Sequence, residues 1–424
     1  MNEWKNYPME RLGALREECR RKYEGFKASG LKLDMSRGKP SPDVLDLSNG
    51  LLEAPASYIC EDGTDARNYG TPTGIPECRR LFGELLGIDP DQIIVGNNAS
   101  LQIMHDIVGR LYFFGTLGGK PWKDLEKVKF ICPSPGYDRH FGVSGEYGAE
   151  MVTVPMTEDG PDMDAVEALA AEDEAVKGIW CVPLYSNPQG IVYSAETVER
   201  MAGMKTKAKD FRVFWDNAYG VHHIYEENCL ADIMEAARRH GNEDRIYYFF
   251  STSKITFPGG GIGMLAASPA NIAEQQAHID VQTIGYEKIA QLRAVNFLKS
   301  PENIKAHMWK VADILRPKFD IVIDTLEREL GGTGLATWQR PKGGYFVSVD
   351  TLDGCAKAVV AKAAEAGTVL TDAGATFPYG KDPRDSNIRI APTFPSEGEL
   401  QQAMDLFCLC VKMASIDKFM DGRR

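Results

Sequence analysis

Polar side chains follow three apolar runs of the sequence, at the point where each run ends. Asp216 follows FRVFW, Lys254 follows IYYFFSTS, and Asn187 lies in SNPQG after GIWCVPLY. A charged group at the end of a buried strand costs free energy unless it is paired or hydrogen-bonded. A lysine amine can act as a nucleophile or carry a proton, and a carboxylate can hold a proton in place. Asn-Pro alone is a common opening of a turn, so each signal is weak by itself.

Small and hydroxyl side chains surround two of these segments. Lys254 is preceded by Ser251, Thr252 and Ser253 and followed by glycines at 259–261, and GNNASLQ at 96–102 opens a predicted helix. The free backbone amides at the start of a helix, together with its dipole, favour a bound anion. In open α/β sheets, ligands sit at the carboxyl ends of the strands. We therefore predict one composite pocket that combines an acid, a lysine, hydroxyls and an amide.

The elements that must position these groups alternate along the chain. Short apolar runs occur in QIIVG, KVKFICP, GIWCVPLY, FRVFWDN and IYYFFS, and helical patterns separate them, for example at 76–86, at 100–111 and in SAETVERMAGMKTKA. Continuous apolar runs of this length are typical of strands that are buried on both faces. The alternation predicts an α/β fold, with a large and mostly parallel sheet of about seven strands covered by helices.

The pattern changes after about residue 295. A long helical pattern starts at residue 300, and GGYFVSVD and SNIRIAP read as strands with helices between and after them. This region predicts a smaller α+β domain. We place an N-terminal segment of that smaller domain at 1–55, the large domain at 56–295 and the small C-terminal domain at 296–424. The N-terminal stretch to about residue 29 reads as an amphipathic helix.

Composition narrows the class of protein. The chain has 424 residues, with 48 Lys plus Arg against 60 Asp plus Glu, so its formal charge is −12. That balance disfavours nucleic acid or an anionic membrane as a partner. The start lacks the apolar core of a secretory signal, and the nine cysteines form no CxxC pair. We therefore expect free thiols, no metal site and a cytoplasmic location.

Seven motifs in order resemble the fold-type I pyridoxal-phosphate enzymes, in particular class I aminotransferases. They are RNYGTPTGIPECRR, GNNASLQ, SPGYDRH, SNPQG, DNAY, STSK and NIRIAP, and their matching residues run from Tyr69 to Arg389. GKPS at 38–41 extends the match. The sequences of the STSKITF and RGKPSPDVLDLS segments are most similar to those of the MocR-like aspartate aminotransferase subgroup.

The resemblance implies pyridoxal 5'-phosphate as the cofactor of the large domain and assigns roles around its ring. Lys254 matches the catalytic lysine that forms a Schiff base with the cofactor and then carries the substrate proton. Asp216 matches the carboxylate that keeps the pyridine nitrogen protonated. Asn187 and Tyr219 match the two donors to the ring oxygen, and Tyr137 matches the aromatic side chain that stacks on the ring.

The resemblance also implies a phosphate site and departs from the family there. The matching phosphate ligands are Asn98, Ala99, Ser100, Ser251, Ser253 and Tyr69. In the family, the tyrosine at the position of Tyr69 reaches the site of the other subunit of a dimer, so we expect a homodimer with shared active sites. Many relatives carry an arginine seven or eight residues after the lysine, but this chain has Gly261 and Ile262 there.

The substrate site follows from the same resemblance. Arg389 matches the arginine that binds the α-carboxylate, for which a guanidinium is suited. The backbone amide of Gly38 and the side chain of Asn187 match further contacts to the substrate. The pattern leaves open which group binds the side-chain carboxylate of a dicarboxylic substrate. The basic candidates near these motifs are Lys39, Arg37, Arg139 and His140.

We therefore predict an aminotransferase that works by a ping-pong mechanism on an amino acid, with aspartate or glutamate favoured, and a 2-oxo acid. A different amino donor, such as alanine or an aromatic amino acid, and a β-elimination lyase stay open, because the same aspartate and lysine serve them. A MocR-like regulator is disfavoured, because only 37 residues precede GKPS and the net charge does not suit DNA. PKGGYF at 341–346 is expected to have a structural role.

Overall fold

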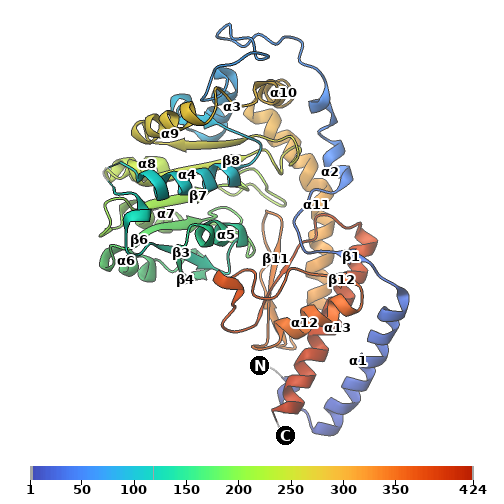
Figure 1. Cartoon of the computed structure of the whole chain (residues 1–424). Coiled ribbons are helices and arrows are strands. Elements are labelled where there is room, and N and C mark those ends of the chain that lie inside the picture. The colour runs from blue at the N-terminus through green and yellow to red at the C-terminus, as the bar shows by residue number, and fades with distance from the viewer. Residues whose placement is uncertain (1–2, 118, 423–424) are drawn as a thin grey trace.

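The computed structural model describes residues 3–117 and 119–422, and an eight-stranded sheet forms the core of one half of it (Figure 1). The strands lie in the spatial order β2 (Ile93–Val95), β9 (Gly263–Ala267), β8 (Ile246–Ser251), β7 (Arg212–Asp216), β6 (Val176–Cys181), β3 (Lys129–Ser134), β4 (Glu150–Thr157) and β5 (Gly160–Pro161). Pairing is parallel from β8 through to β4, whereas β9 is antiparallel to both of its neighbours and β5 is antiparallel to β4. The predicted mostly parallel sheet is confirmed, with β5 as a two-residue addition at its edge.

Helices cover both faces of this sheet. They are α3 (Pro76–Leu86), α4 (Ser100–Phe114), α5 (Asp138–Glu146), α6 (Met163–Glu172), α7 (Ala195–Gly203), α8 (Ile233–Arg239), α9 (Pro269–Gln282) and α10 (Lys288–Leu298), with short 3₁₀ turns η3 (Pro90–Gln92), η4 (Trp122–Asp124) and η5 (Glu243–Arg245). Successive residues of a strand point to opposite faces. Accordingly, Val213 and Trp215 of β7 lie in one apolar cluster and Phe214 lies in the other. This two-sided burial explains why the strands are continuous apolar runs.

The other half of the structure contains two small sheets and long helices (Figure 1). β10 (Ala336–Trp338), β11 (Val347–Thr351) and β13 (Asn387–Ile390) form an antiparallel sheet, and β1 (Leu33–Asp34) pairs with β12 (Thr368–Val369) in parallel. The helical elements are η1 (Glu3–Asn6), α1 (Met9–Ser29), α2 (Pro42–Asp46), η2 (Asn49–Leu52), α11 (Pro301–Leu330), α12 (Ala356–Glu365), η6 (Pro378–Gly380) and α13 (Glu397–Asp421). Among the described residues, no helix is long and apolar enough to cross a membrane.

The N-terminal segment packs against the C-terminal part of the chain. β1 pairs with β12, the Tyr23 hydroxyl donates to the carbonyl of Lys362 at 2.8 Å, and Arg16 forms an ion pair with Asp417 at 2.9 Å. Helix α1 therefore lies beside α13, as Figure 1 shows. The predicted boundaries at 55 and 295 stay a prediction, and residues 1–2, 118 and 423–424 of the predicted ranges lie outside the described residues.

Candidate active site

The carboxyl ends of the parallel strands bring the predicted residues to one edge of the large sheet. Tyr137 follows β3, Asn187 follows β6, Asp216 ends β7 and Lys254 follows β8. These four strands are neighbours and run in the same direction, so their ends meet. β2 is related to β8 by two antiparallel pairings and therefore also runs in that direction. The 96–100 loop consequently reaches the same edge.

A cavity of about 560 Å³ lies between this edge and the smaller sheets. Of the predicted site residues, the cavity brings together Gly38, Tyr137, Asn187, Tyr219, Lys254 and Arg389. Asp216 is buried below them, with 2% of its surface exposed. Ser251 is buried at the end of β8, and the Ser253 hydroxyl donates to the carbonyl of Asn98 at 3.4 Å. The structure therefore gathers the predicted set from both halves of the chain, with the exception of Tyr69.

Asp216 is held by a buried histidine. Its Oδ2 lies 3.0 Å from Nε2 of His140, and the His140 ring stacks on Trp180 with centroids 4.5 Å apart and planes 12° from parallel. Within the described part of the chain, Asp216 Oδ1 is buried without a hydrogen-bond partner. His140 is 1% exposed and is absent from the cavity lining, so its suggested role in binding a substrate carboxylate is wrong. His140 lies in the first turn of α5, and from there its ring reaches the carboxylate of Asp216.

Lys254 lies over the face of an aromatic ring. Its Nζ is 4.9 Å from the centroid of the Tyr219 ring. Burial lowers the pKa of the Lys254 amine, and the charge of Asp216 partly opposes that shift. Burial also raises the pKa of the Tyr219 phenol well above its ordinary value, and it raises the pKa of Tyr137 to about 12. Both phenols therefore keep their protons at neutral pH and can donate hydrogen bonds.

The start of α4 offers backbone amides beside Lys254. Ala99 is the N-cap residue, and its side chain caps none of the amides of the first turn. Gly263 crosses this turn so closely that a Cβ atom there would lie 2.6 Å from the carbonyl carbon of Ala99 and 2.7 Å from the amide nitrogen of Ser100. In the described part of the chain, no lysine or arginine side chain hydrogen-bonds to residues 97–100. The loop therefore presents amides and hydroxyls to an anion.

Ile262 stands where the resemblance led us to look for a phosphate-binding arginine, and it is held in place by backbone hydrogen bonds. Ile262 is 2% exposed, and its amide donates to Oγ1 of Thr252 at 2.9 Å while its carbonyl accepts from the amide of Thr252 at 2.9 Å. An apolar side chain therefore fills the core at this point.

Arg389 on β13 faces the cavity with several partners. Its Nη1 donates to Asp138 Oδ1 at 3.0 Å and to Asn187 Oδ1 at 3.2 Å, and its guanidinium carbon lies 4.8 Å from the centroid of the Phe346 ring. Because Oδ1 of Asn187 accepts from Arg389, the Nδ2 group of Asn187 is left to donate elsewhere. The sequence analysis did not identify Asp138 and Phe346 as site residues. Asp138 lies inside the recognised motif SPGYDRH, and Phe346 lies inside PKGGYF.

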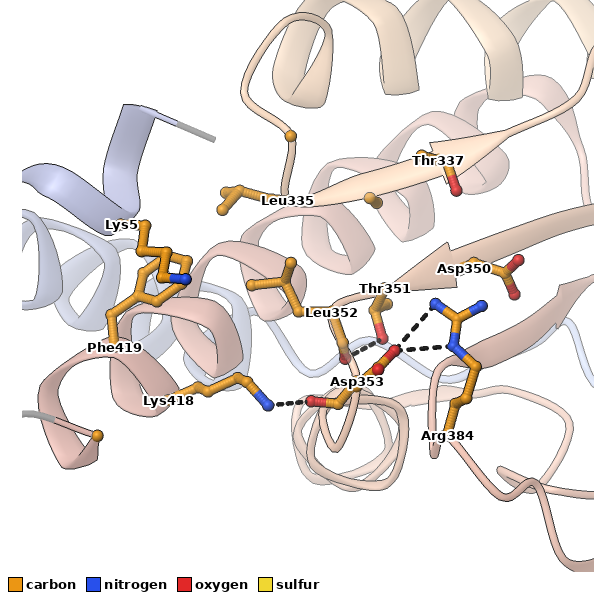
Figure 2. A pocket seen from close by; sticks show the side chains of 13 residues that line it. Lys5, Leu335, Thr337, Asp350, Thr351, Leu352, Asp353, Arg384, Lys418 and Phe419 are labelled. Atoms are coloured by element: carbon orange, nitrogen blue, oxygen red, sulfur yellow. Dashed lines mark hydrogen bonds and ion pairs between the residues drawn. The ribbon is translucent and has the colours of Figure 1, made fainter. Parts of the chain in front are cut away.

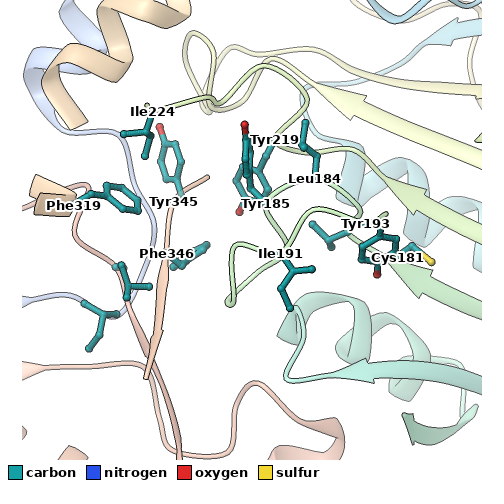
Figure 3. Close-up of a cluster of buried hydrophobic side chains, with 14 of the residues drawn as sticks. Cys181, Leu184, Tyr185, Ile191, Tyr193, Tyr219, Ile224, Phe319, Tyr345 and Phe346 are labelled. Carbon is teal, nitrogen blue, oxygen red and sulfur yellow. The ribbon is translucent and has the colours of Figure 1, made fainter. Parts of the chain in front are cut away.

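An apolar cluster joins the two halves (Figure 3), and its members Tyr219 and Phe346 also line the cavity. Tyr219 and Tyr345 stack with centroids 6.2 Å apart, and Tyr185 packs against Gly343 and Gly344, where a Cβ would lie within 3.0 Å of its side chain. PKGGYF therefore has the expected structural role, and through Phe346 it also contributes to the cavity wall.

A larger cavity, of about 680 Å³, lies in the smaller half between the 334–337 and 350–353 segments and the end of α13 (Figure 2). Arg384 binds the Asp353 carboxylate at 2.9 Å, and the Lys418 amine donates to the Asp353 carbonyl. These charges are satisfied within the wall. The smaller cavity at the strand ends is therefore the better candidate for the chemistry.

Tyr69 lies outside the cavity. It is 77% exposed and precedes α3, and Figure 1 shows α3 and α10 at the same end of the structure. The Lys288 amine anchors the neighbouring residue by donating to the Gly70 carbonyl at 3.0 Å. An anchored backbone with an exposed tyrosine suits a contact outside its own chain.

This fold and strand-end site define a pyridoxal-phosphate aminotransferase of fold type I. The chain belongs to the aspartate aminotransferase family, because the family model described as "Aspartate amino-transferase" matches residues 9–423. A protein of Mycolicibacterium smegmatis that carries an aminotransferase name is 47% identical, over 97% of this chain and 98% of that one. The aspartate aminotransferase of Corynebacterium glutamicum is 42% identical, over 98% and 96%.

A solved structure supports the same assignment. The crystal structure of an aspartate transaminase from Corynebacterium glutamicum matches with a TM-score of 0.96 and 41% identity, and the match covers 98% of this chain and 99% of that one. The family cofactor, pyridoxal 5'-phosphate, fits the site in two respects. The unpartnered Oδ1 of Asp216 suits a protonated ring nitrogen, and the turn under Gly263 suits a phosphate group.

Proposed function

We propose that this aminotransferase moves the amino group of aspartate or glutamate to a 2-oxo acid by a ping-pong mechanism. The observation that carries the proposal is the charge of the cavity wall. The wall has five basic side chains against two acidic ones, although the whole chain has a formal charge of −12. The basic residues are Arg37, Lys39, Arg139, Lys254 and Arg389, and the acidic ones are Asp138 and Asp372. Such a wall favours substrates with two carboxylates, and the name of the Corynebacterium glutamicum relative supports the same class.

Each residue around the cofactor then has a defined task. Bound pyridoxal phosphate supplies the electron sink that makes the Cα–H bond of the amino acid acidic. We assign Lys254 to move that proton, because burial lowers the pKa of its amine and so makes the neutral base accessible. Asp216, fixed by His140, keeps a proton on the ring nitrogen. Asn187 and Tyr219 donate to the ring oxygen, and Tyr137 stacks on the ring.

The phosphate and the substrate carboxylate take the remaining contacts. The backbone of Asn98, Ala99 and Ser100 and the hydroxyls of Ser251 and Ser253 hold the phosphate, and Tyr69 of a second subunit completes that site. Arg389 binds the α-carboxylate with help from the amide of Gly38. Asp138 holds Arg389 at 3.0 Å, so the incoming carboxylate has to replace or share that contact.

A donor screen tests the proposed substrate class. The holoenzyme is supplied with one amino acid at a time and 2-oxoglutarate, and the 2-oxo acid formed is measured beside pyruvate and ammonia. We expect aspartate to give oxaloacetate faster than alanine or phenylalanine gives its own 2-oxo acid. Ammonia release from β-substituted donors would identify a lyase, and a preference for alanine or aromatic donors would replace the dicarboxylic assignment.

We further propose that the protein forms a homodimer. We also propose that each chain consists of a small-domain segment at 1–55, a cofactor-binding domain at 56–295 and the rest of the small domain at 296–424. The pairing of β1 with β12 supports this division.

The cysteines support a cytoplasmic location for the enzyme. All nine are unpaired and eight of them are buried, and thiols stay reduced in the cytoplasm.

A further inference from the structure

We infer that Arg37 binds the side-chain carboxylate of a dicarboxylic substrate, an inference that rests on the proposed function. Arg37 follows β1 and lines the cavity together with Arg389, although the two lie 352 positions apart in the chain. Two carboxylates of one small substrate require two cations that share a single wall. The contacts that bring the 36–39 segment to Arg389 satisfy this requirement.

Phe346 provides the first of these contacts. Gly38 packs so closely on the Phe346 ring that a Cβ at residue 38 would lie 2.6 Å from its Cζ atom. The Arg389 guanidinium carbon lies 4.8 Å from the centroid of the same ring. Phe346 is therefore held between the two segments, and any side chain larger than that of glycine at 38 would separate them.

Thr371 provides the second contact. Its hydroxyl donates to the carbonyl of Ser36 at 2.7 Å and accepts from Nε of Arg389 at 3.4 Å. The residues on both sides of Arg37 are thus connected to the α-carboxylate clamp, one through Thr371 and the other through Phe346. Arg37 is in consequence fixed at its backbone beside the clamp while its side chain stays exposed to the cavity.

The other basic side chains of the wall already have partners. Arg389 is paired with Asp138, and Arg139 lies 4.0 Å from the second oxygen of the same carboxylate. Lys39 lies 3.7 Å from Asp34 and over the Phe394 ring at 5.4 Å. Among the described residues, none forms an ion pair or hydrogen bond with the Arg37 guanidinium. Its charge is therefore the one available to a second carboxylate, which a guanidinium can bind through two parallel hydrogen bonds.

The test compares a dicarboxylic with a monocarboxylic donor. Holoenzyme with Arg37→Gln is assayed for kcat/KM with aspartate and with alanine, beside the wild type and a matched control, Arg21→Gln, at an exposed position of α1 outside the cavity. We expect the ratio of aspartate to alanine to fall roughly 10- to 100-fold in Arg37→Gln, because a charge-assisted contact is lost. The control keeps the wild-type ratio.

A binding measurement gives a readout that is independent of turnover. Calorimetric titration with succinate and with propionate measures how much the second carboxylate adds to affinity, and Arg37→Gln is expected to remove most of that difference. An unchanged ratio and an unchanged difference in Arg37→Gln would overturn the inference, as would the same losses appearing in Lys39→Gln or Arg139→Gln instead. If the wild type itself does not prefer aspartate to alanine, the proposed function fails rather than the assignment of Arg37.

Discussion

The two oxygens of Asp216 are in different surroundings, and this difference decides what the residue can do. Oδ2 is bound by His140, whose ring cannot rotate freely because it stacks on Trp180. Oδ1 is buried and has no partner among the described residues. A buried acceptor without a donor costs about 1–3 kcal/mol. The protonated ring nitrogen of the cofactor would remove that cost, so in the proposed site the binding of the cofactor and its protonation would be coupled through this one atom.

Replacement of Asp216 tests that coupling. We expect Asp216→Ala to retain part of the bound cofactor but to lose several orders of magnitude in kcat, because the ring no longer holds its proton at low cost. His140→Asn is expected to lose less, since the carboxylate stays in place with a weaker anchor. Steady-state kcat values with aspartate and 2-oxoglutarate compare the two variants. A near-normal rate in Asp216→Ala would make Asp216 a structural residue.

Lys254 is the second residue whose removal has a defined outcome. We expect Lys254→Ala to abolish turnover and to remove the visible absorption band of the lysine-bound cofactor, because we assign both the attachment of the cofactor and the transfer of the proton to this amine. Lys305→Ala is the matched control, since Lys305 is an exposed lysine that pairs with Glu227. An unchanged visible spectrum in Lys254→Ala would exclude the attachment.

At the scale of elements, the shape of the proposed phosphate site depends on how closely β9 passes the start of α4. We expect Gly263→Ala to weaken cofactor retention and to destabilise the fold by about 1–3 kcal/mol, because the added methyl meets backbone atoms that cannot move away. Gly259→Ala is the control, because nothing lies within 4 Å of a Cβ at that position. Dialysis followed by cofactor quantification, together with urea unfolding, measures the two effects. Equal retention in both variants would show that β9 does not shape the phosphate site.

The elements that the sequence predicts are those with strong local patterns. The helix expected at 76–86 is α3 with the same bounds, because Pro76 starts it and Gly87 ends it in a left-handed conformation. The apolar runs became β2, β3, β6, β7 and β8. β4 and β9 were not identified, since β4 is only partly buried and β9 is a five-residue run, GMLAA, in which three residues are glycine or alanine.

Contacts between distant segments were harder to predict than elements. The motifs placed Asp216 and Lys254 at strand ends, and parallel pairing then brought the ends together. The approach of the 36–39 segment to Arg389 runs through Phe346, whose motif was given only a structural role, and through Thr371, which no local pattern marks. His140 was counted among the candidates for the substrate carboxylate for the same reason, because only tertiary packing shows that its ring contacts Asp216.

At the scale of the whole molecule, a buried histidine makes stability depend on pH. Both ring nitrogens of His222 are buried without partners in the described part of the chain, and burial, with a smaller effect from Lys254, lowers its pKa from 6.5 to about 3. Between these two values the unfolded chain binds a proton that the folded chain does not bind. The free energy of unfolding therefore falls as pH decreases from 6.5 toward 3, by up to about 1.4 kcal/mol per pH unit from this group.

The variant His222→Gln isolates this contribution. Urea unfolding of the cofactor-free protein at fixed concentration, from pH 7 to pH 4.5, should give a shallower loss of stability in the variant than in the wild type. The comparison is of slopes, because the new side chain also changes the absolute stability. Identical slopes would mean that the folded protein accepts a proton at His222 and that its site opens to water.

The assembly of two chains gives the last prediction. Tyr69 is exposed on a loop whose backbone is anchored by Lys288, and the cavity of its own chain does not include it. With Ile262 in place of a cation, a phosphate contact from a second subunit gains importance. We expect Tyr69→Phe to weaken cofactor retention while the spectrum of the bound fraction stays the same, because only a hydroxyl contact to the phosphate is lost.

Mixing variants tests whether the sites are shared. A variant inactivated at Tyr69, such as Tyr69→Ala, is combined with Lys254→Ala under conditions in which subunit exchange is shown independently, for example by differently tagged chains. A mixed C2 dimer then contains one site with both residues intact and one with neither. Activity should therefore return in part after exchange, up to about half that of the wild type per mixed dimer. If exchange occurs and no activity returns, Tyr69 acts within its own subunit, and each chain would have to bring that loop to its own cavity.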